Sequence, residues 1–448
     1  MSARAKSRTS AAVENATLSV NEKILRECHE LYTEEEVGLI EIAKDIGIPL
    51  LAPRKKITVM LIGNHSAGKS TFINWYVEEH VQKTGVAIET QGFTIVTSGK
   101  KRESLTGNAT FHLYPHLQPL QDMQGVMDYI STEITTSKQK KFSLVTFIDT
   151  PGLVDGDMKY PFDVNKSITW IGENIADLIF VFFDPIGQAL CKRTLNIVEH
   201  LSEDHAEKMK FYLSKADEAG HESDRQRVMM QIVQELCKRP NLNRTGFDMP
   251  TIFVPTLGKQ SRCVNQIESV CKEVEKTINA TIQNTLNTLE KDCLEIADKI
   301  DRLIEQDNGA CSHNLRAKGK GFGLFMLGSF LPIVVLANFL AVSLSKEALE
   351  STFGVTGAAT LKTYTSPVSA VWSAVPEQYF WHSCGVFALI TLMLLFVAVF
   401  VSRSLPTMSR KRKRNLLHGR DFVLSEVKVR KEALYKEYLK QSVAAYDM

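Results

Sequence analysis

Between residues 57 and 256, short apolar segments alternate with segments of helical periodicity. Five of the apolar segments read ITVMLIG, FSLVTFIDT, ADLIFVFFD, KMKFYLSKAD and PTIFVP. Apolar runs of this length, separated by helices, are typical of strands that are buried on both faces of a parallel sheet. The pattern predicts an α/β domain with a mostly parallel sheet over residues 53–258.

Helical periodicity flanks this domain on both sides. Within residues 1–52, which begin with a polar segment, apolar positions between 19 and 50 predict two short helices. From 264 to 306 apolar residues recur every three or four positions, and neither proline nor glycine interrupts them. This pattern predicts a long amphipathic helix, assigned here to a stalk over 259–318. A helix packed on its own domain would show the same pattern.

Two segments near the other end of the chain carry no charged residue. Residues 321–345 and 378–402 each span about 25 positions, enough to cross the hydrocarbon core of a bilayer. The second is the stronger signal, because Pro332 and Asn338 interrupt the first. We expect two transmembrane helices with an intervening loop over 319–402; buried core helices are the alternative.

The charges around these segments predict their orientation. Basic residues flank the pair on its outer sides: Arg316, Lys318, Lys320, Arg403 and the run 410–414. The loop at 346–377 holds only two basic residues, Lys346 and Lys362. Basic residues next to a membrane span favour its cytosolic side, so both termini and the α/β domain are expected in the cytosol. A re-entrant hairpin would give the same bias, and the endoplasmic reticulum and the mitochondrial outer membrane are both compatible hosts.

The tail, residues 403–448, is basic and amphipathic. Five apolar residues recur in it at roughly helical spacing: Phe422, Val427, Leu434, Tyr438 and Leu439. Such a helix lies on an anionic bilayer surface, packs back on a stalk, or stays solvated, and the pattern does not choose among these.

Overall composition excludes several classes of protein. The formal net charge of +2 gives no global field for nucleic acid, which is not an expected partner. The eight cysteines form neither a CxxC pair nor a Cys/His cluster with metal-ligand spacing. Scattered single cysteines are typical of a protein in a reducing compartment. The first twenty residues have no apolar core, so a cleaved signal peptide is not expected.

A glycine-rich turn follows the first apolar segment. Residues 63–70, GNHSAGKS, fit the pattern G-x-x-x-x-G-K-[ST] between a strand and a helix. Backbone N–H groups and the helix N-terminus hold phosphate oxygens in such a turn, Lys69 reaches the β- and γ-phosphates, and Ser70 ligates Mg²⁺. The nucleotide-binding residues predicted here are Asn64, His65, Ser66, Ala67, Gly68, Lys69, Ser70 and Thr71.

Two further motifs end later apolar segments. In DTPG, Asp149 can hold the Mg²⁺ shell and the Gly152 N–H can contact a γ-phosphate. In SKAD, the Asp217 carboxylate can accept two N–H bonds from a guanine edge, while the stem of Lys215 covers the base. Their order along the chain agrees with that of the phosphate-binding turn.

These motifs together resemble the dynamin superfamily of large GTPases, and within it the EHD-type branch. The resemblance covers about residues 57–256. It implies that Thr90, in ETQGF, is the switch I threonine that orders the attacking water and ligates Mg²⁺. It also implies catalytic roles for Ser66 and Lys69. No arginine finger is evident in the sequence, so turnover is expected to depend on dimerisation of the nucleotide-binding heads. Two late membrane segments are similar to the hairpin anchors of mitofusins, atlastins and bacterial dynamin-like proteins.

One departure from the family leaves the base open. Ser214 replaces the usual Asn or Thr of the base motif, and EHD-type proteins use ATP. We expect a membrane-anchored GTPase that hydrolyses GTP with Mg²⁺ to remodel, tether or fuse membranes, with the bilayer and further copies of the chain as partners. The alternatives are an EHD-like ATPase, a nucleotide-binding scaffold with little turnover, and a membrane receptor whose head senses nucleotide.

Overall fold

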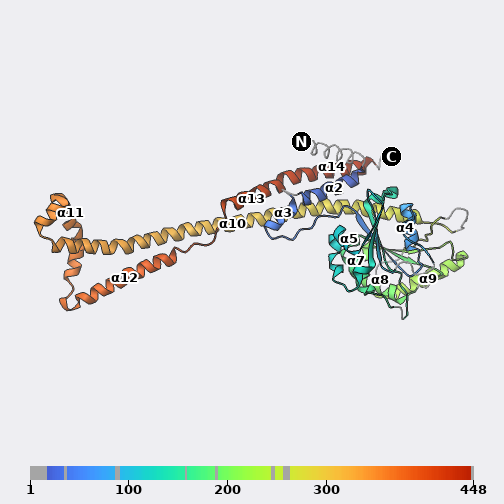
Figure 1. Ribbon diagram of the computed structural model, residues 1–448, viewed down its shortest axis with the longest axis horizontal. Coiled ribbons are helices and arrows are strands. Elements are labelled where there is room, and N and C mark those ends of the chain that lie inside the picture. Colours follow the sequence, from blue (N-terminus) through green and yellow to red (C-terminus); the bar gives the residue numbers. More distant parts are fainter. Residues whose placement is uncertain are drawn as a thin grey trace. The chain divides into compact units, whose positions relative to one another are not determined.

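The computed structural model describes residues 18–34, 38–85, 91–156, 159–186, 190–243, 248–255 and 263–444. The chain divides into two compact units (Figure 1). The first comprises residues 1–294 and 424–448, and the second comprises 295–423.

A seven-stranded sheet forms the core of the first unit. Its strands are β1 (Ile57–Gly63), β2 (Phe93–Ser98), β3 (Glu103–Thr106), β4 (Ile130–Thr135), β5 (Val145–Asp149), β6 (Leu178–Phe183) and β7 (Met209–Leu213). Their order is β3-β4-β2-β5-β1-β6-β7. β1 pairs in parallel with β5 and β6, as do β6 with β7 and β2 with β4, whereas β2–β5 and β3–β4 are antiparallel. The predicted mostly parallel α/β sheet is confirmed.

Four of the five apolar segments are strands. The positions of β1, β5 and β6 are all buried, which explains their continuous apolar sequences. The prediction of a fifth strand at 250–255 was wrong, because Thr251 forms only an isolated bridge with Leu213. Strands β2, β3 and β4 were not predicted, since their sequences, FTIVTS, ESLT and ISTEIT, are rich in hydroxyl and charged side chains.

Helices surround this sheet. They are α4 (Lys69–Val77), α5 (Gly107–Leu113), α6 (Gln118–Gln121), α7 (Val164–Asn174), α8 (Lys192–His205) and α9 (Glu222–Cys237). Short 3₁₀ segments lie at Pro115–Leu117, Val126–Tyr129, Gln139–Leu144 and Ala206–Lys208. Phe72 of α4 meets Phe147, Phe180 and Phe182 edge to face, with ring centroids 5.5 to 6.2 Å apart. This aromatic contact fixes α4, and with it the turn before α4, against β1, β5 and β6.

Helices from three parts of the chain pack together in the first unit. They are α2 (Val20–Thr33), α14 (Lys428–Ala444) and the first part of α10 (Ile267–Ser343); α3 (Leu39–Asp45) follows α2. Four bonds join them: Lys23 to Glu437 (3.1 Å), Tyr32 to Asp292 (2.6 Å), Gln283 to Tyr438 (2.8 Å) and Lys431 to Glu290 (2.6 Å). The two short N-terminal helices are therefore present.

The tail helix packs on α2 and α10. Leu434 and Tyr438 are buried, as are Phe422 and Val427 in the π-helical stretch Phe422–Val427, whereas Leu439 is 46% exposed. Of the alternatives that the sequence left open, packing against the stalk helix is the one observed.

The second unit is helical. The predicted stalk and the first uncharged segment form the single continuous helix α10, and the predicted loop at 346–377 is largely the helix α11 (Lys346–Ser373), which breaks at Gly354. After the 3₁₀ turn Glu377–Tyr379 come α12 (Phe380–Val401) and α13 (Arg410–Asp421). Where a loop was predicted, the Ser345 side chain caps the start of α11 by accepting from the Ala348 N–H.

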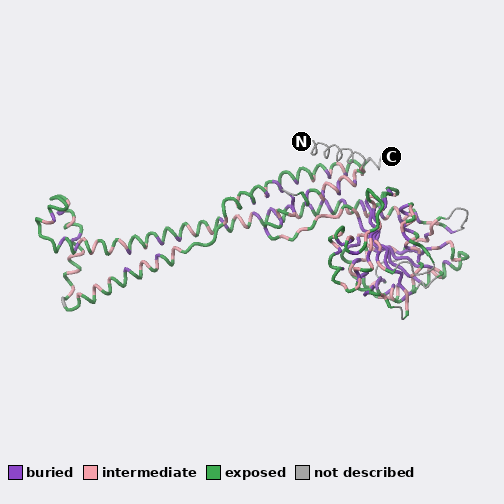
Figure 2. Tube along the Cα trace, viewed as in Figure 1, coloured by how far each residue is buried: buried purple, intermediate pink, exposed green. Residues whose placement is uncertain are grey.

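Two helices are long and apolar enough to cross a membrane. The best windows of α10 and α12 have mean hydropathies of 2.2 and 2.9, and only 17% and 11% of these windows is buried. Figure 2 shows the exposure along both helices. A core helix of a soluble protein would be mostly buried, and these windows are not.

The two apolar helices approach each other closely. A Cβ added at Gly321 would lie 2.7 Å from the Cβ of Ser402, and one added at Gly328 would lie 3.2 Å from a methyl group of Leu395. Close approach at small residues is how helices associate within membranes, where burial of apolar surface gives little driving force.

Candidate nucleotide-binding site

The glycine-rich turn between β1 and α4 is built from two residues in left-handed backbone conformation. Ser66 has φ +61° and Gly68 has φ +84°. The turn ends at Lys69, the first residue of α4, so the free N–H groups of the helix start face the turn. This arrangement presents backbone donors to an anion, as the sequence pattern predicted.

The Lys69 ammonium lies over this turn. Its Nζ donates to the carbonyl oxygens of Gly63 (3.0 Å) and Asn64 (3.1 Å), and the side chain is buried. Burial lowers the pKa of Lys69, and the nearby Asp149 carboxylate opposes that shift. A buried cation held by carbonyl groups alone can exchange these weak contacts for a phosphate at little cost.

Ser70 and Asp149 meet beside the turn. The Ser70 hydroxyl donates to Oδ2 of Asp149 at 2.5 Å. Burial raises the pKa of Asp149, while Lys69 and the Ser70 hydrogen bond oppose the rise. The contact joins the first turn of α4 to the last residue of β5, which are neighbours because β1 and β5 are parallel.

The second oxygen of Asp149 provides a test for Mg²⁺. Among the described residues, Oδ1 of Asp149 is buried and has no hydrogen-bond partner. A buried carboxylate oxygen without a donor is costly, and a cation beside it would remove that cost. One hydroxyl and one carboxylate are too few to form a protein-only metal site, but Mg²⁺ normally completes its shell with water and substrate phosphate. These residues therefore fit Mg²⁺ bound together with a nucleotide.

The DTPG segment pairs with the phosphate-binding turn. The Leu153 carbonyl accepts from the His65 N–H at 3.0 Å, and the Thr150 hydroxyl donates to the Leu61 carbonyl at 2.7 Å. A Cβ at Gly152 would lie 2.8 Å from the Cα of His65. Only glycine fits this close approach, and it brings the Gly152 backbone beside the turn.

The SKAD motif lies at the end of β7, next to the same turn. Lys215 has φ +49°, and a Cβ at Gly68 would lie 3.9 Å from its Cγ. The Lys215 ammonium lies 3.5 Å from the buried Asp184. The Ser214 hydroxyl donates to the Phe183 carbonyl at 3.1 Å. Ser214 is therefore committed to the backbone of β6.

A cavity of about 240 Å³ opens between these motifs. Its lining combines residues of the turn and α4, of the base motif and of the segment after it: Gly68, Thr71, Phe72, Phe182, Ser214, Lys215, Asp217, Glu218, Ile252, Phe253, Val254 and Ile267. It has the apolar walls and the carboxylate that a purine base requires.

The structure thus brings nearly all predicted site residues together. The side chain of Asn64 points away from the turn, because its Oδ1 accepts from the Thr194 hydroxyl of α8. His65 and Ala67 lie in the turn, and Thr71 lines the cavity. Thr90 lies outside the described residues.

Sequence reasoning missed two acidic residues around the site. Asp155 accepts from the backbone N–H groups of Lys192 and Arg193, at 2.8 and 3.1 Å, and so caps the start of α8. Asp184 holds Lys215 as described above. The only sequence signal was the position of Asp184 at the end of the ADLIFVFFD segment.

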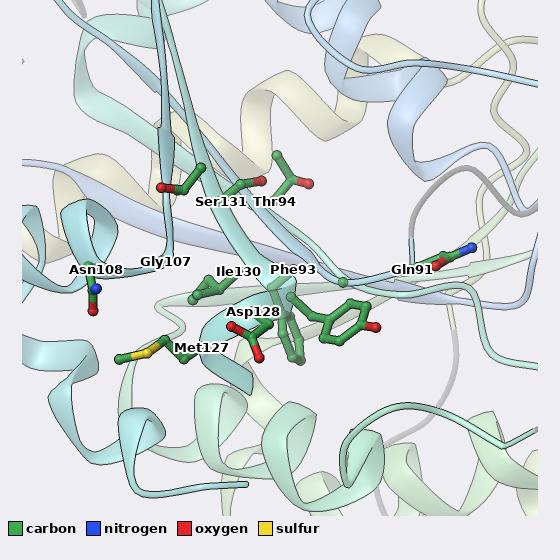
Figure 3. A pocket seen from close by; sticks show the side chains of 12 residues that line it. Gln91, Phe93, Thr94, Gly107, Asn108, Met127, Asp128, Ile130 and Ser131 are labelled. Atoms are coloured by element: carbon green, nitrogen blue, oxygen red, sulfur yellow. The ribbon is translucent and has the colours of Figure 1, made fainter. Parts of the chain in front are cut away.

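A second cavity, of about 470 Å³, is lined in part by Thr94, which pairs with Asp149 in the sheet (Figure 3). It is lined by the starts of β2 and β4, by the junction of β3 with α5 and by the 3₁₀ turn Val126–Tyr129, and Asp128 is its one charged lining residue. None of the predicted nucleotide-binding residues lines it.

Comparison with known proteins agrees with this geometry. Residues 59–184 match the model of the Dynamin family. EH domain-containing protein 1 of Arabidopsis thaliana is 27% identical over 173 residues, which are 36% of this chain and 30% of that protein. EH domain-containing protein 3 of Homo sapiens is 25% identical over 170 residues, 36% of this chain and 31% of that protein. The match thus spans about a third of the length of these curated relatives.

Two solved structures are also similar. One is a bacterial dynamin from an oligomerised pair that is described as providing a mechanism for the long-range sensing and tethering of membranes. It is 12% identical, with a TM-score of 0.42, and the alignment covers 95% of this chain and 78% of that chain. The other is Era of Aquifex aeolicus bound to GDP and AlF4⁻, with a TM-score of 0.29 at 14% identity, covering 49% and 56%.

The fold and the site define a P-loop nucleotide-binding protein. Residues 59–184 of this domain are similar to the Dynamin family, and the domain is similar at low identity to EH domain-containing proteins.

Proposed function

We propose that this chain is a membrane-anchored, dynamin-like GTPase that hydrolyses GTP with Mg²⁺ and uses the cycle to remodel, tether or fuse membranes. The observation that carries the proposal is the contact of Ser70 with Asp149 beside the phosphate-binding turn. The dynamin-family match supports the reaction, and the two exposed apolar helices support the anchor.

In this proposal the chain's own residues position the phosphates. The backbone N–H groups of the turn and the Lys69 ammonium hold the β- and γ-phosphates and stabilise charge that develops during attack by water. Mg²⁺, when bound by Ser70 and Asp149, neutralises phosphate charge. The Gly152 N–H contacts the γ-phosphate, Ser66 stabilises the transition state, and Thr90 orders the water.

The base is assigned to the cavity beside SKAD. Asp217 accepts from the two donors of a guanine edge, and the stem of Lys215 covers the ring. ATP is the second candidate, and a specific observation favours it: the Ser214 hydroxyl is bonded to the Phe183 carbonyl and not directed at a base.

The anchor is assigned to α10 and α12 as a hairpin. Its orientation follows from the basic residues at the outer ends of both helices, which favour the cytosolic side. Further copies of this chain are the proposed partners of the nucleotide-binding head.

Steady-state phosphate release, measured with GTP or ATP and with or without liposomes, tests this proposal. Release that needs Mg²⁺ and rises with membrane supports it. Tight nucleotide binding without turnover would favour a scaffold instead.

A further inference from the structure

Two stretches of the second unit hold basic residues and no acidic ones. No Asp or Glu occurs from 308 to 346 or from 378 to 420. Four basic residues in these stretches are exposed and stand next to the ends of the apolar segments, and we call them the collar: Arg316, Lys318, Lys320 and Arg403.

Two contacts hold the parts of the collar at the same level. The Asn314 side chain pairs with the backbone of Leu405 in both directions, donating to its carbonyl at 2.8 Å and accepting from its N–H at 2.7 Å. Further along α10, Gly321 packs against Ser402. The collar residues of α10 and Arg403 lie between these two contacts, so they form one group in space although about 80 residues separate them in sequence.

A second basic group lies farther from the apolar segments. Asp307, whose side chain is almost fully buried, accepts from the Met408 N–H at 2.7 Å and from Lys413 at 3.1 Å, and Arg420 lies 2.8 Å from Asp301. The start of α13 therefore runs back along α10. We call its exposed residues the outer group: Arg410, Lys411 and Arg414.

Helix geometry separates the two groups by depth. At 1.5 Å per residue, Arg316 lies about 8 Å along α10 from Gly321, whereas the level of Asp307 lies about 21 Å from it. The polar headgroup layer on each side of a bilayer is roughly 5 to 8 Å thick. With Gly321 at the edge of the hydrocarbon, the collar lies within the headgroup layer and the outer group lies outside it.

We propose that the collar binds the phosphate groups of anionic lipids in the leaflet on the side of the chain termini. The proposal rests on the proposed membrane anchor and does not depend on GTP hydrolysis. The collar carries positive charge without a compensating carboxylate, and it lies at headgroup depth beside two apolar helices. It therefore matches an anionic lipid surface in both charge and position. Each such residue strengthens the attraction roughly fivefold at low ionic strength.

Spin-labelled lipids test this binding directly. The full-length protein is reconstituted into phosphatidylcholine vesicles with a trace of spin-labelled phosphatidylserine or phosphatidylcholine, and the motionally restricted fraction is measured by electron paramagnetic resonance. We expect several-fold stronger association of phosphatidylserine with the wild type, and loss of that preference in 0.5 M salt, as for exposed charges.

Three variants assign the effect to the collar. Replacing Arg316, Lys318, Lys320 and Arg403 by Gln should remove the preference. The outer-group variant, with Arg410, Lys411 and Arg414 replaced by Gln, should keep most of it. A matched control removes four exposed lysines of the first unit and should keep all of it: Lys83, Lys101, Lys138 and Lys166 to Gln.

The outcomes separate this proposal from the proposed function. A restricted component with no preference for phosphatidylserine overturns the collar and leaves the anchor intact, whereas the absence of any restricted lipid overturns both. If the collar variant does not reconstitute, the outer-group variant decides: a preference kept by that variant supports the collar, and a preference lost in it overturns the proposal. Binding of a fluorescent single-stranded RNA that the collar variant alone loses, with no lipid preference, would assign the collar to nucleic acid and contradict the proposal.

Discussion

The Ser70 hydroxyl donates a hydrogen bond of 2.5 Å to Asp149, 79 residues away in sequence. Ser70 lies in the first turn of α4 and Asp149 ends β5, so the parallel pairing of β1 with β5 brings them together. A hydroxyl and a carboxylate oxygen thereby lie beside the glycine-rich turn, and the other carboxylate oxygen of Asp149 lacks a donor among the described residues.

Lys69→Ala should abolish hydrolysis. Its ammonium is the buried cation over the turn, so its loss removes the charge that holds the β- and γ-phosphates. We expect phosphate release to fall about 100-fold or more, the scale for removing one stabilising donor from a transition state. Lys83→Ala, an exposed lysine after α4, is the control and should leave the rate unchanged. Hydrolysis at the wild-type rate with a normal circular dichroism spectrum would show that the site is wrongly assigned.

Gly152→Ala should also inactivate the protein, for a steric reason. The new methyl group would lie 2.8 Å from the Cα of His65, so either the DTPG segment or the phosphate-binding turn must move. A shift of this size in a positioned group costs on the order of 100-fold in rate. The control is Gly309→Ala, where no atom lies within 4 Å. Equal phosphate release by the two variants would contradict the close packing.

The sequence predicted the strands whose positions are all buried and missed those with polar positions. In β2 and β4 hydroxyl groups are satisfied inside the fold: Thr97 lies 3.2 Å from Thr146 of β5, and Thr132 lies 2.9 Å from Thr110 of α5. Such pairs remove the cost of burying polar residues, but they form between segments far apart in sequence. A reading of apolar runs therefore cannot find these strands.

The same limit applies to the site. Lys69 and Ser70 could be predicted because the turn that holds them is contiguous in sequence. Asp155 and Asp184 could not, because their roles depend on contacts with the start of α8 and with Lys215. The continuous helix through 267–343 was also divided in the prediction, since a change from amphipathic to apolar sequence does not end a helix.

Asp217→Ala should remove the preference for GTP over ATP. A carboxylate accepts from the two donors of the guanine edge, and hydrogen bonds to a charged group contribute about 1.5 to 3 kcal/mol each. We expect wild-type protein to bind GTP more tightly in competition titrations, and Ser214→Asn to strengthen that preference by restoring the usual side chain. Equal or tighter binding of ATP by the wild type would contradict the guanine assignment and favour the ATPase alternative.

Stability should fall steeply above about pH 9. Burial raises the pKa of Cys28 and of Cys293 to about 12 each. The folded chain therefore keeps both protons while the unfolded chain releases them, so rising pH favours unfolding. Two thiols give a slope of about 2.7 kcal/mol per pH unit between pH 9 and 12.

Thermal unfolding of the full chain in detergent between pH 7 and 11 measures this dependence. The double variant Cys28→Ala, Cys293→Ala should lose stability more slowly than the wild type above pH 9, and the two should run in parallel between pH 7 and 8. Parallel curves over the whole range would show that these thiols do not titrate as their burial implies.

The anchor predicts both extraction and topology. The protein should stay in the membrane pellet after alkaline carbonate, and deletion of residues 321–402 should release it. In sealed vesicles with the termini outside, a membrane-impermeant thiol reagent should label the exposed Cys311 of α10. A cysteine introduced by Thr360→Cys in α11 should be shielded. Labelling of both at the same rate would indicate a re-entrant hairpin that does not cross.

The most direct test of the central claim is GTP hydrolysis by the full-length protein in proteoliposomes, measured as steady-state phosphate release with and without Mg²⁺ and compared with Ser70→Ala. We expect release that requires Mg²⁺, is faster in the bilayer than in detergent, and is lost in the variant. GTP bound tightly without phosphate release, or a rate that neither Mg²⁺ nor Ser70→Ala changes, would contradict it.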